Sequence, residues 1–166
     1  MLILSKIQKM KIFLILIGKT NEKYLQEGVL EYVKRLKHYS NFQMIEIQNI
    51  KNSKNLSQIE IMKKEGDLIL KQLNNSDHIV ILDSKGKDFT SSKFSQKLQQ
   101  WMLTGKKRIV FVIGGAYGLS DSVYLRGNEL LSLSKMTFSH QMIRLFFVEQ
   151  LYRGYTLLNN EPYHHQ

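Results

Sequence analysis

The sequence predicts an α/β domain whose parallel sheet carries helices on both faces. Short apolar runs rich in β-branched residues alternate along the chain with longer segments of helical periodicity. This alternation favours parallel strands, because a parallel connection needs a crossover that is long enough to contain a helix. Arg108–Ile113 is apolar after its first residue, which is typical of a strand buried on both faces of a parallel sheet.

The first half of the chain is expected to form a strand, a helix, an edge strand and a second helix. Ile12–Ile17 has the length and β-branching of a strand, and residues 22–38 place apolar side chains at the spacing of one helix face. Phe42–Ile47 alternates apolar and polar residues, as a half-exposed strand does. Residues 51–57 are polar and are expected to form a loop, and the next helix should end near Leu73.

The middle of the chain continues the alternation with a strand and a capped helix. His78–Leu82 is a short β-branched run, and residues 83–87 have a composition typical of a turn. Ser91 or Ser92 is expected to cap a helix that runs to Thr104, because hydroxyl oxygens accept hydrogen bonds from the free amides of a first helical turn.

The last third of the chain is expected to form two strands and two helices. Arg108–Ile113 leads into two glycines and a short helix from about Ser120, and Leu130–Leu133 is a short strand. The final helix should begin near His140 and end by Asn159, and it is apolar on nearly every side. Such a helix is buried all round. We therefore expect a symmetric partner to cover the side of this helix that faces away from the sheet.

The composition indicates a globular protein whose positive charge favours polyanionic partners, with a lysine-rich surface that serves solubility as the alternative. The chain of 166 residues is 43% hydrophobic and has a net charge of +10, which favours nucleic acid over an anionic membrane surface. The sequence has no cysteine, which excludes disulfides, iron–sulfur clusters, cysteine zinc sites and a cysteine nucleophile. No apolar run approaches the roughly 20 residues of a membrane span, so we expect no membrane association and a cytoplasmic location. One domain is expected over residues 10–166, with residues 1–9 as an extension of unknown role.

Three segments that follow expected strands are candidates for a ligand site. Gly114–Gly118 follows a strand and precedes a helix, where glycines allow backbone amides to approach a ligand. Its spacing is not that of a dinucleotide-binding loop, and taken alone it fits a tight turn equally well. Residues 83–87 and Ser132–Phe138 follow two other strands, so the three segments either converge on one pocket or form three separate turns.

The last helix carries the charged side chains most suited to chemistry. Glu149 and Arg153 have the spacing and order of a helical ion pair, and a structural role is their default interpretation. Arg144 lies among apolar residues, where its charge needs a partner or an anion. The histidines show no spacing typical of metal ligands, so we expect no metal.

Taken together, the segments near the C-terminus resemble a known family. These segments read FVIGGAYGLS, LSLSKMTFSHQMIRLFFVEQLYRGY and PYH, and they are joined by MKIFLILIGK and LDSKGK earlier in the chain. The pattern extends from Met10 to His164 and resembles the RlmH family, the ribosomal large-subunit pseudouridine methyltransferases of the SPOUT superfamily. The resemblance implies a parallel α/β domain with a C-terminal deep trefoil knot, and a homodimer. It also implies S-adenosylmethionine-dependent methylation of N3 of a pseudouridine in 23S rRNA, in the stem-loop that faces the subunit interface of the assembled ribosome.

The resemblance also assigns roles to individual residues. The methyl donor, S-adenosylmethionine, is expected to contact, mainly through their backbone, Leu82, Gly114, Gly115, Leu133, Ser134, Lys135, Met136, Thr137 and Phe138. Residues expected near the target base are Arg144, Tyr152, Arg153, Tyr163 and His164. In the reaction, Arg144 is expected to stabilise the developing anion, and His140 or His164 to accept the proton. Ser139 stands where the family usually has proline, and serine is still able to cap the last helix.

Three other functions are alternatives to methylation of 23S rRNA. A dinucleotide-binding oxidoreductase requires a glycine-rich fingerprint after the first strand, and Gly18 is followed by Lys19 and Thr20 instead. A non-catalytic protein that binds RNA or the ribosome fits the charge equally well, but it has no need of a donor site. A methyltransferase of the same superfamily that acts on tRNA is the nearest alternative.

Overall fold

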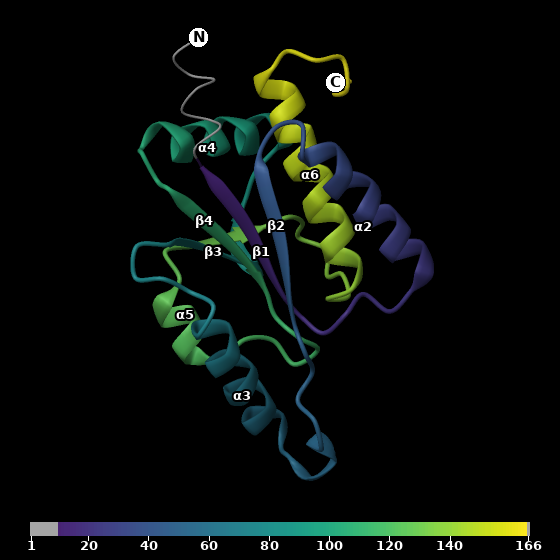
Figure 1. The fold of residues 1–166 in the computed structure, drawn as a ribbon, viewed down its shortest axis with the longest axis vertical. Helices are drawn as coiled ribbons and strands as arrows, with labels where there is room; N and C mark the ends of the chain where they lie inside the picture. Colours follow the sequence, from purple (N-terminus) through teal and green to yellow (C-terminus); the bar gives the residue numbers. More distant parts are fainter. Residues whose placement is uncertain (1–9, 166) are drawn as a thin grey trace.

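Five parallel strands form the centre of residues 10–165, the part of the chain that this computed structural model describes (Figure 1). The expected extension of residues 1–9 lies outside the described residues. The strands lie in the order β2-β1-β4-β3-β5. Their bounds are Lys11–Ile17 for β1, Asn41–Ile47 for β2, His78–Asp88 for β3, Arg108–Ile113 for β4 and Glu129–Ser132 for β5. The predicted strands are confirmed, as is their parallel pairing.

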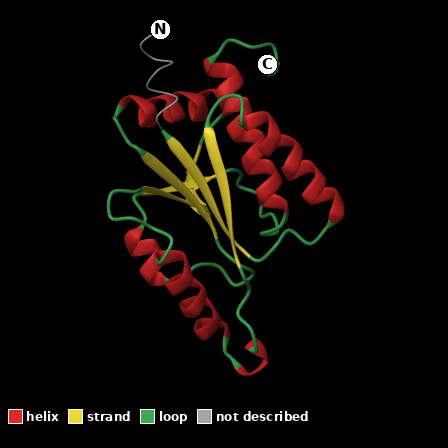
Figure 2. Ribbon diagram, viewed as in Figure 1, coloured by secondary structure: helices red, strands yellow, loops and turns green. Residues whose placement is uncertain are grey.

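Helices cover both faces of this sheet, as the sequence predicts (Figure 2). Helices α2, α4 and α6 pack on one face, and α3 and α5 pack on the other. Their bounds are Lys23–Leu36 for α2, Gln58–Leu70 for α3, Ser91–Leu103 for α4, Asp121–Arg126 for α5 and Met142–Leu158 for α6. The loop expected at residues 51–57 includes one short 3₁₀ turn, Ser53–Asn55. None of the helices in the described residues is long and apolar enough to cross a membrane.

Alternate residues of the central strands divide the core between the two helical layers. In β1, Ile12, Leu14 and Leu16 pack toward α2, α4 and α6. Phe13 and Ile15 pack toward α3 and α5. Side chains alternate across a strand, so a strand with helices on both sides must be apolar at every position. This explains the continuous apolar runs of β1 and β4.

The predicted turn at residues 83–87 is wrong, because β3 continues through it in irregular form. Lys87 pairs with Leu131 and Asp88 with Ser132, after a shift of register that begins at Leu82. Gly86 makes this path possible, since a Cβ atom there would lie 2.6 Å from the backbone nitrogen of Leu131. The turn-forming residues 83–87 therefore form a bulge within β3, after which β3 pairs with β5 again.

The cap of α4 also differs from the prediction. Thr90, not Ser91 or Ser92, precedes the first helical turn, and its Oγ1 accepts a hydrogen bond from the backbone amide of Lys93 at 3.2 Å. The Ser91 hydroxyl instead donates to Gln150 Oε1 of α6 at 2.7 Å. Thr90, Ser91 and Ser92 are equally able to cap a helix by their chemistry. The contact of Ser91 with α6 engages that hydroxyl elsewhere, and Thr90 is the cap.

Helix α6 packs against its own chain along much of its length, and the partner expected on its other side stays a prediction. It lies between α2 and α4 and against the sheet, with Phe147, Val148 and Leu151 in the same core cluster as both helices. Gly154 brings α6 close to α4, because a Cβ there would meet Leu98 Cδ2 at 3.5 Å. Phe146, 38% exposed, lies outside this cluster. Packing within the chain therefore uses part of the apolar surface of α6 and leaves Phe146 exposed.

Candidate active site

A cavity of about 380 Å³ opens at the carboxyl ends of β4 and β5 and beside the irregular part of β3 that follows Leu82. Leu82 closes it from β3, Ile113 from β4 and Leu131 from β5. In open parallel sheets this edge is the usual place of a ligand site, because the loops after several strands meet there. The three candidate segments of the sequence therefore converge on one pocket and are not separate turns.

The Gly114–Gly118 loop forms one wall of the cavity, and its glycines are required by its shape. The amide of Gly118 donates to the Gly115 carbonyl at 3.1 Å, and Gly118 has φ +92°, a left-handed conformation. A Cβ on Gly114 would lie 2.9 Å from Leu119 Cγ and 3.0 Å from the carbonyl carbon of Gly118. The loop thus doubles back on itself and presents backbone to the cavity.

The segment after β5 forms the opposite wall. Ser132 Oγ donates to the Ser134 carbonyl at 2.8 Å, and the amide of Met136 donates to Ser134 Oγ at 2.9 Å. These local bonds curl the segment over the cavity, where Met136 is 74% exposed. Lys135 does not line the cavity, and its ammonium lies 3.9 Å from the Asp88 carboxylate.

The expected donor-binding residues therefore gather at this cavity, with one exception. Those that line it are Leu82, Gly114, Gly115, Leu133, Ser134, Met136, Thr137 and Phe138. The exception is Lys135, whose side chain turns outward. Most of the lining is backbone, small side chains and apolar groups, which suits a ligand recognised by shape and by a few polar contacts.

Asp83 and Tyr124 are lining residues that the sequence did not single out as a pair. Tyr124 Oη donates to Asp83 Oδ2, and Asp83 Oδ1 accepts from the amide of Lys85 at 2.7 Å. Burial, and then the bond to Asp83, raise the pKa of Tyr124, so its hydroxyl stays protonated at neutral pH. No local pattern pairs these residues, because they are 41 positions apart.

His140 lies at the rim of the cavity, at the start of the turn that leads into α6. Burial, and then the positive charge of Arg144, lower the pKa of His140. Its imidazole is therefore neutral at physiological pH and able to accept a proton. Ser139 is not the N-cap of α6, which is Gln141, but its Oγ accepts a hydrogen bond from the amide of Met142, the first residue of the helix, at 3.1 Å.

Arg144 is fully buried, and its guanidinium is directed at backbone oxygens and not into the cavity. It donates to the carbonyls of Ile17 at 2.5 Å, Gly18 at 3.0 Å and His140 at 3.1 Å. It also donates to Thr20 Oγ1 at 3.1 Å. The partner that its charge requires is thus the loop after β1, together with the turn before α6.

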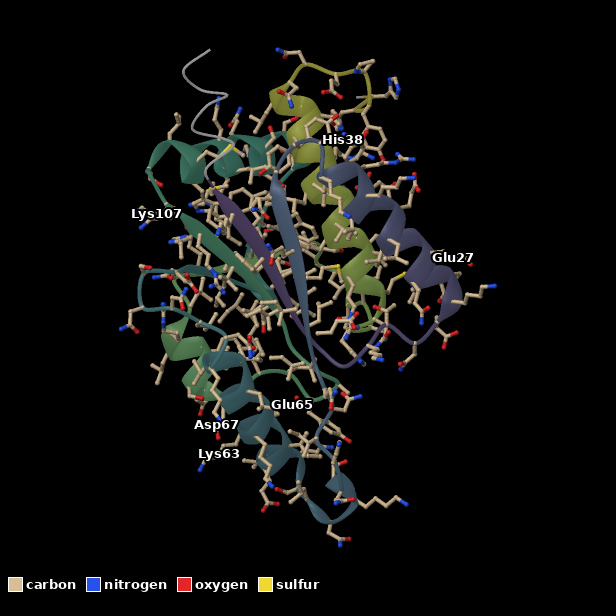
Figure 3. The ribbon with its side chains drawn as sticks, in the orientation of Figure 1. Glu27, His38, Lys63, Glu65, Asp67 and Lys107 are labelled. Carbon is tan, nitrogen blue, oxygen red and sulfur yellow. The ribbon has the colours of Figure 1, made fainter. Side chains whose placement is uncertain are left out.

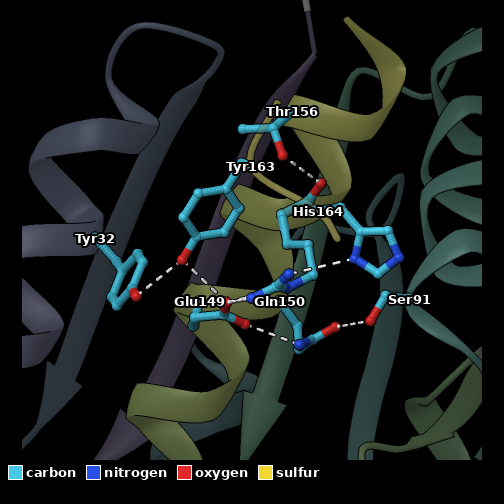
Figure 4. Close-up of polar contacts among 8 residues, drawn as sticks. Tyr32, Ser91, Glu149, Gln150, Thr156, Tyr163 and His164 are labelled. Atoms are coloured by element: carbon cyan, nitrogen blue, oxygen red, sulfur yellow. Dashed lines mark hydrogen bonds and ion pairs between the residues drawn. The ribbon is translucent and has the colours of Figure 1, made fainter. Parts of the chain in front are cut away.

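The remaining residues expected near the target base form, together with Glu149, a separate group on α6 and the segment after it, and Figure 4 shows the polar contacts around Tyr163 and His164. We call this group, Glu149, Tyr152, Arg153, Tyr163 and His164, the outer cluster. The ion pair predicted between Glu149 and Arg153 is confirmed. Arg153 Nη1 donates to His164 Nδ1 at 3.2 Å, and Tyr163 Oη donates to Glu149 Oε1 at 3.1 Å.

The outer cluster does not line the cavity within one chain. Tyr152 and Tyr163 pack edge to face, with ring centroids 4.8 Å apart, and the Arg153 guanidinium lies over the Tyr163 ring. Tyr32 of α2 joins them through a hydroxyl contact of 3.0 Å with Tyr163. The chain therefore presents two sites, one hollow and made of backbone, the other aromatic and charged. Within the described residues, no group of three or more acidic or histidine side chains is arranged to hold a metal ion.

Comparison with known proteins identifies the family. A family model described as "Predicted SPOUT methyltransferase" matches residues 10–164. Proteins named ribosomal RNA large subunit methyltransferase H are similar along 95% of this chain and 100% of their own length. They include those of Parabacteroides distasonis at 58% identity, Flavobacterium johnsoniae at 54% and Bacteroides thetaiotaomicron at 49%. Because both kinds of match span nearly the whole sequence, the chain belongs to the SPOUT methyltransferase family.

Proposed function

We propose that this protein transfers a methyl group from S-adenosylmethionine to N3 of a pseudouridine in 23S rRNA, in the stem-loop that faces the subunit interface. The observation that carries the proposal is the cavity at the strand ends, which gathers the expected donor-binding residues except Lys135. The names of the similar proteins support large-subunit rRNA as the substrate. The pseudouridine and its stem-loop come from the resemblance to the RlmH family.

The cavity fits the methyl donor in size and chemistry. A volume of about 380 Å³ lies within the range of small-molecule sites. Leu82, Leu133 and Phe138 offer apolar surface for an adenine ring, and the Gly114–Gly118 loop offers backbone groups. The bound donor would supply an electrophilic methyl group on its sulfonium, so the protein's task is to orient that group and the base. We propose further that the segment around Leu133–Phe138 is part of the trefoil knot of the family.

Removal of the N3 proton is assigned to a neutral histidine. His140 fits this role because it lines the cavity and its lowered pKa keeps the imidazole unprotonated. Arg144 then acts by position, since it holds the carbonyl of His140 and the loop after β1 in fixed places. His164 is the second candidate for the base, and its Nδ1 already accepts a hydrogen bond from Arg153.

The outer cluster is proposed to bind the RNA. The tyrosine rings provide stacking surfaces for unpaired bases, and Arg153 provides a cation for phosphate or for a base edge. Because the cluster lies off the cavity of its own chain, we propose a homodimer in which a second protomer completes the substrate site. The net charge of +10 supports binding to the rRNA backbone.

The experiment is methyl transfer from labelled S-adenosylmethionine to RNA that lacks the modification. Free 23S rRNA, isolated large subunits, whole ribosomes and tRNA are compared, and the labelled base is mapped. We expect label at one pseudouridine of the stem-loop, in whole ribosomes only. Label in tRNA would overturn the proposed substrate, and donor binding without transfer to any of these RNAs would overturn the proposed reaction.

A matched pair of variants links the label to the cavity. Gly114→Val fills the loop where no Cβ fits, so it should abolish both donor binding and transfer. Gly105→Val also strains the backbone, because Gly105 has φ +72°, but this glycine is distant from the cavity lining and nothing lies within 4 Å of an added Cβ, so stability should fall while donor binding persists. A ribosome-binding protein without catalysis would show no donor binding in any variant.

A further inference from the structure

Glu65 is a charged residue on the buried face of α3. It shares that face with Gly66 and Ile69, whereas Lys63 and Asp67 of the same helix are exposed. Figure 3 shows Lys63 and Asp67 on the outer side of α3 and Glu65 on the side toward the loop between β4 and α5. An apolar residue at this position would complete an ordinary amphipathic helix.

One carboxyl oxygen of Glu65, Oε2, is buried without a hydrogen-bond partner in the described residues. The residue is 7% exposed, and its Oε2 has no hydrogen-bond partner within residues 10–165. Burial accordingly raises the pKa of Glu65, and no other group contributes to the shift. An unpaired buried carboxyl destabilises a fold, so packing alone does not account for glutamate here.

The neighbour of this carboxyl group is the cavity loop. A Cβ placed on Gly115 would lie 2.8 Å from Glu65 Oε2 and 3.2 Å from Oε1. The carboxyl group therefore rests against the bare α-carbon of Gly115, and a side chain there would push the loop away from α3. Gly115 also lines the cavity, which Glu65 does not reach, so Glu65 lies behind the wall that the ligand would contact.

We infer that Glu65 is a positioning residue for the donor site. Its Oε2 accepts a hydrogen bond from a backbone amide of the Gly114–Gly118 loop when the donor is bound, and so holds the loop in its binding conformation. The acceptor stands directly behind the loop, since Oε2 lies 2.8 Å from the place that a Cβ on Gly115 would take, and each residue of the loop carries a backbone amide. Oε2 thereby gains the partner that it otherwise lacks. The inference rests on the donor binding proposed above.

The test compares stability with donor binding in two substitutions of Glu65. Glu65→Leu removes the buried polar group, so its Tm should equal or exceed that of the wild type. S-adenosylmethionine should nevertheless bind it about tenfold or more weakly by calorimetry, because a bond to a charged acceptor is lost. Glu65→Gln retains an acceptor and should bind within about threefold of the wild type. Asp67→Asn, exposed on the same helix, is the control and should change neither quantity.

Each outcome of this comparison decides the inference. An unchanged donor affinity in Glu65→Leu overturns the inference. A loss of donor affinity that both substitutions share, together with a fall in Tm, also overturns it, because such a loss reflects damage to the fold. If the wild type does not bind the donor, the proposed function fails. If the wild type and Glu65→Leu both bind the donor equally well, the proposed function stands and only the role of Glu65 fails.

A second test measures the coupling between Glu65 and the loop. Gly115→Ala should weaken donor binding, because its methyl group would meet the carboxyl oxygen at 2.8 Å. In a Glu65→Ala background the clash is removed, and Gly115→Ala should weaken binding much less. Additive effects of the two substitutions would contradict the contact.

Discussion

The two sides of α6 use the same residue type in opposite ways. On the inner side, Arg144 is fully buried and donates to three carbonyls and one hydroxyl. On the outer side, Arg153 is paired with Glu149 and lies over the Tyr163 ring near the surface. The buried contacts of Arg144 hold the loop after β1 and the turn before α6 in place, whereas Arg153 is partly exposed and lies among aromatic and charged neighbours. The comparison teaches that burial on one side of α6 turns an arginine into a structural donor, and that partial exposure on the other side leaves an arginine near the surface, where we propose that RNA binds.

Substitutions of Arg144 and Arg153, on the two sides of α6, are expected to differ most in their effect on folding stability. Arg144→Ala leaves buried carbonyls of the β1–α2 loop without donors, which should cost about 3–5 kcal/mol in the free energy of unfolding. Arg153→Ala removes a pair near the surface and should cost about 1 kcal/mol. Urea denaturation measures both values, and equal losses would break the comparison.

The next effect separates RNA binding from donor binding. Arg153→Ala should lower kcat/KM for ribosomes on the order of 10- to 100-fold, because one cationic contact to the nucleic acid is lost. The calorimetric Kd for S-adenosylmethionine should stay unchanged, since Arg153 does not line the cavity. Lys34→Ala, exposed on α2, removes the same charge elsewhere and serves as the control. A matching loss in that control would assign the effect to net charge.

A smaller effect tests the cavity loop with two glycines of similar conformation. Gly118 has φ +92° and Gly105 has φ +72°, and neither has an atom within 4 Å of an added Cβ. Alanine at either position should cost about 1–2 kcal/mol of stability through backbone strain. Only Gly118→Ala should also weaken donor binding, since Gly118 alone of the two lines the cavity. Equal donor affinities of the two variants would argue against the loop as a donor site.

The smallest effect is a displacement of the pH profile. The pKa of His140 is lowered by burial and by Arg144, so its imidazole stays neutral as the pH falls past the usual value of about 6.5. The acid limb of kcat should therefore lie below pH 6.5, and His140→Gln should remove it together with most of the rate. If His164→Gln removes the limb instead, the base belongs to the outer cluster.

The segments that line the cavity were predictable as candidates, because strands and the loops after them are recognised from local sequence patterns. Alternation of apolar runs and helical patterns gives the strands, and parallel strands place the segments after them at one edge. The Gly114–Gly118 loop was a candidate from the residues themselves, although taken alone it fitted a tight turn equally well. The resemblance to a known family then assigned the donor contacts, and the structure brings all of them except the Lys135 side chain to the cavity.

The sequence by itself thus determined the parallel α/β fold, the order of its elements and the loops at the strand ends, because residue type and periodicity act over a few residues. The tertiary structure alone decided which groups meet across the chain. Arg144 contacts carbonyls 126 and 127 positions away, and Glu65 faces Gly115 from a different helix. The packing of α6 against α2 and α4 likewise joins segments that are far apart in the sequence. Such contacts depend on how the chain crosses the sheet, and no local pattern encodes that path.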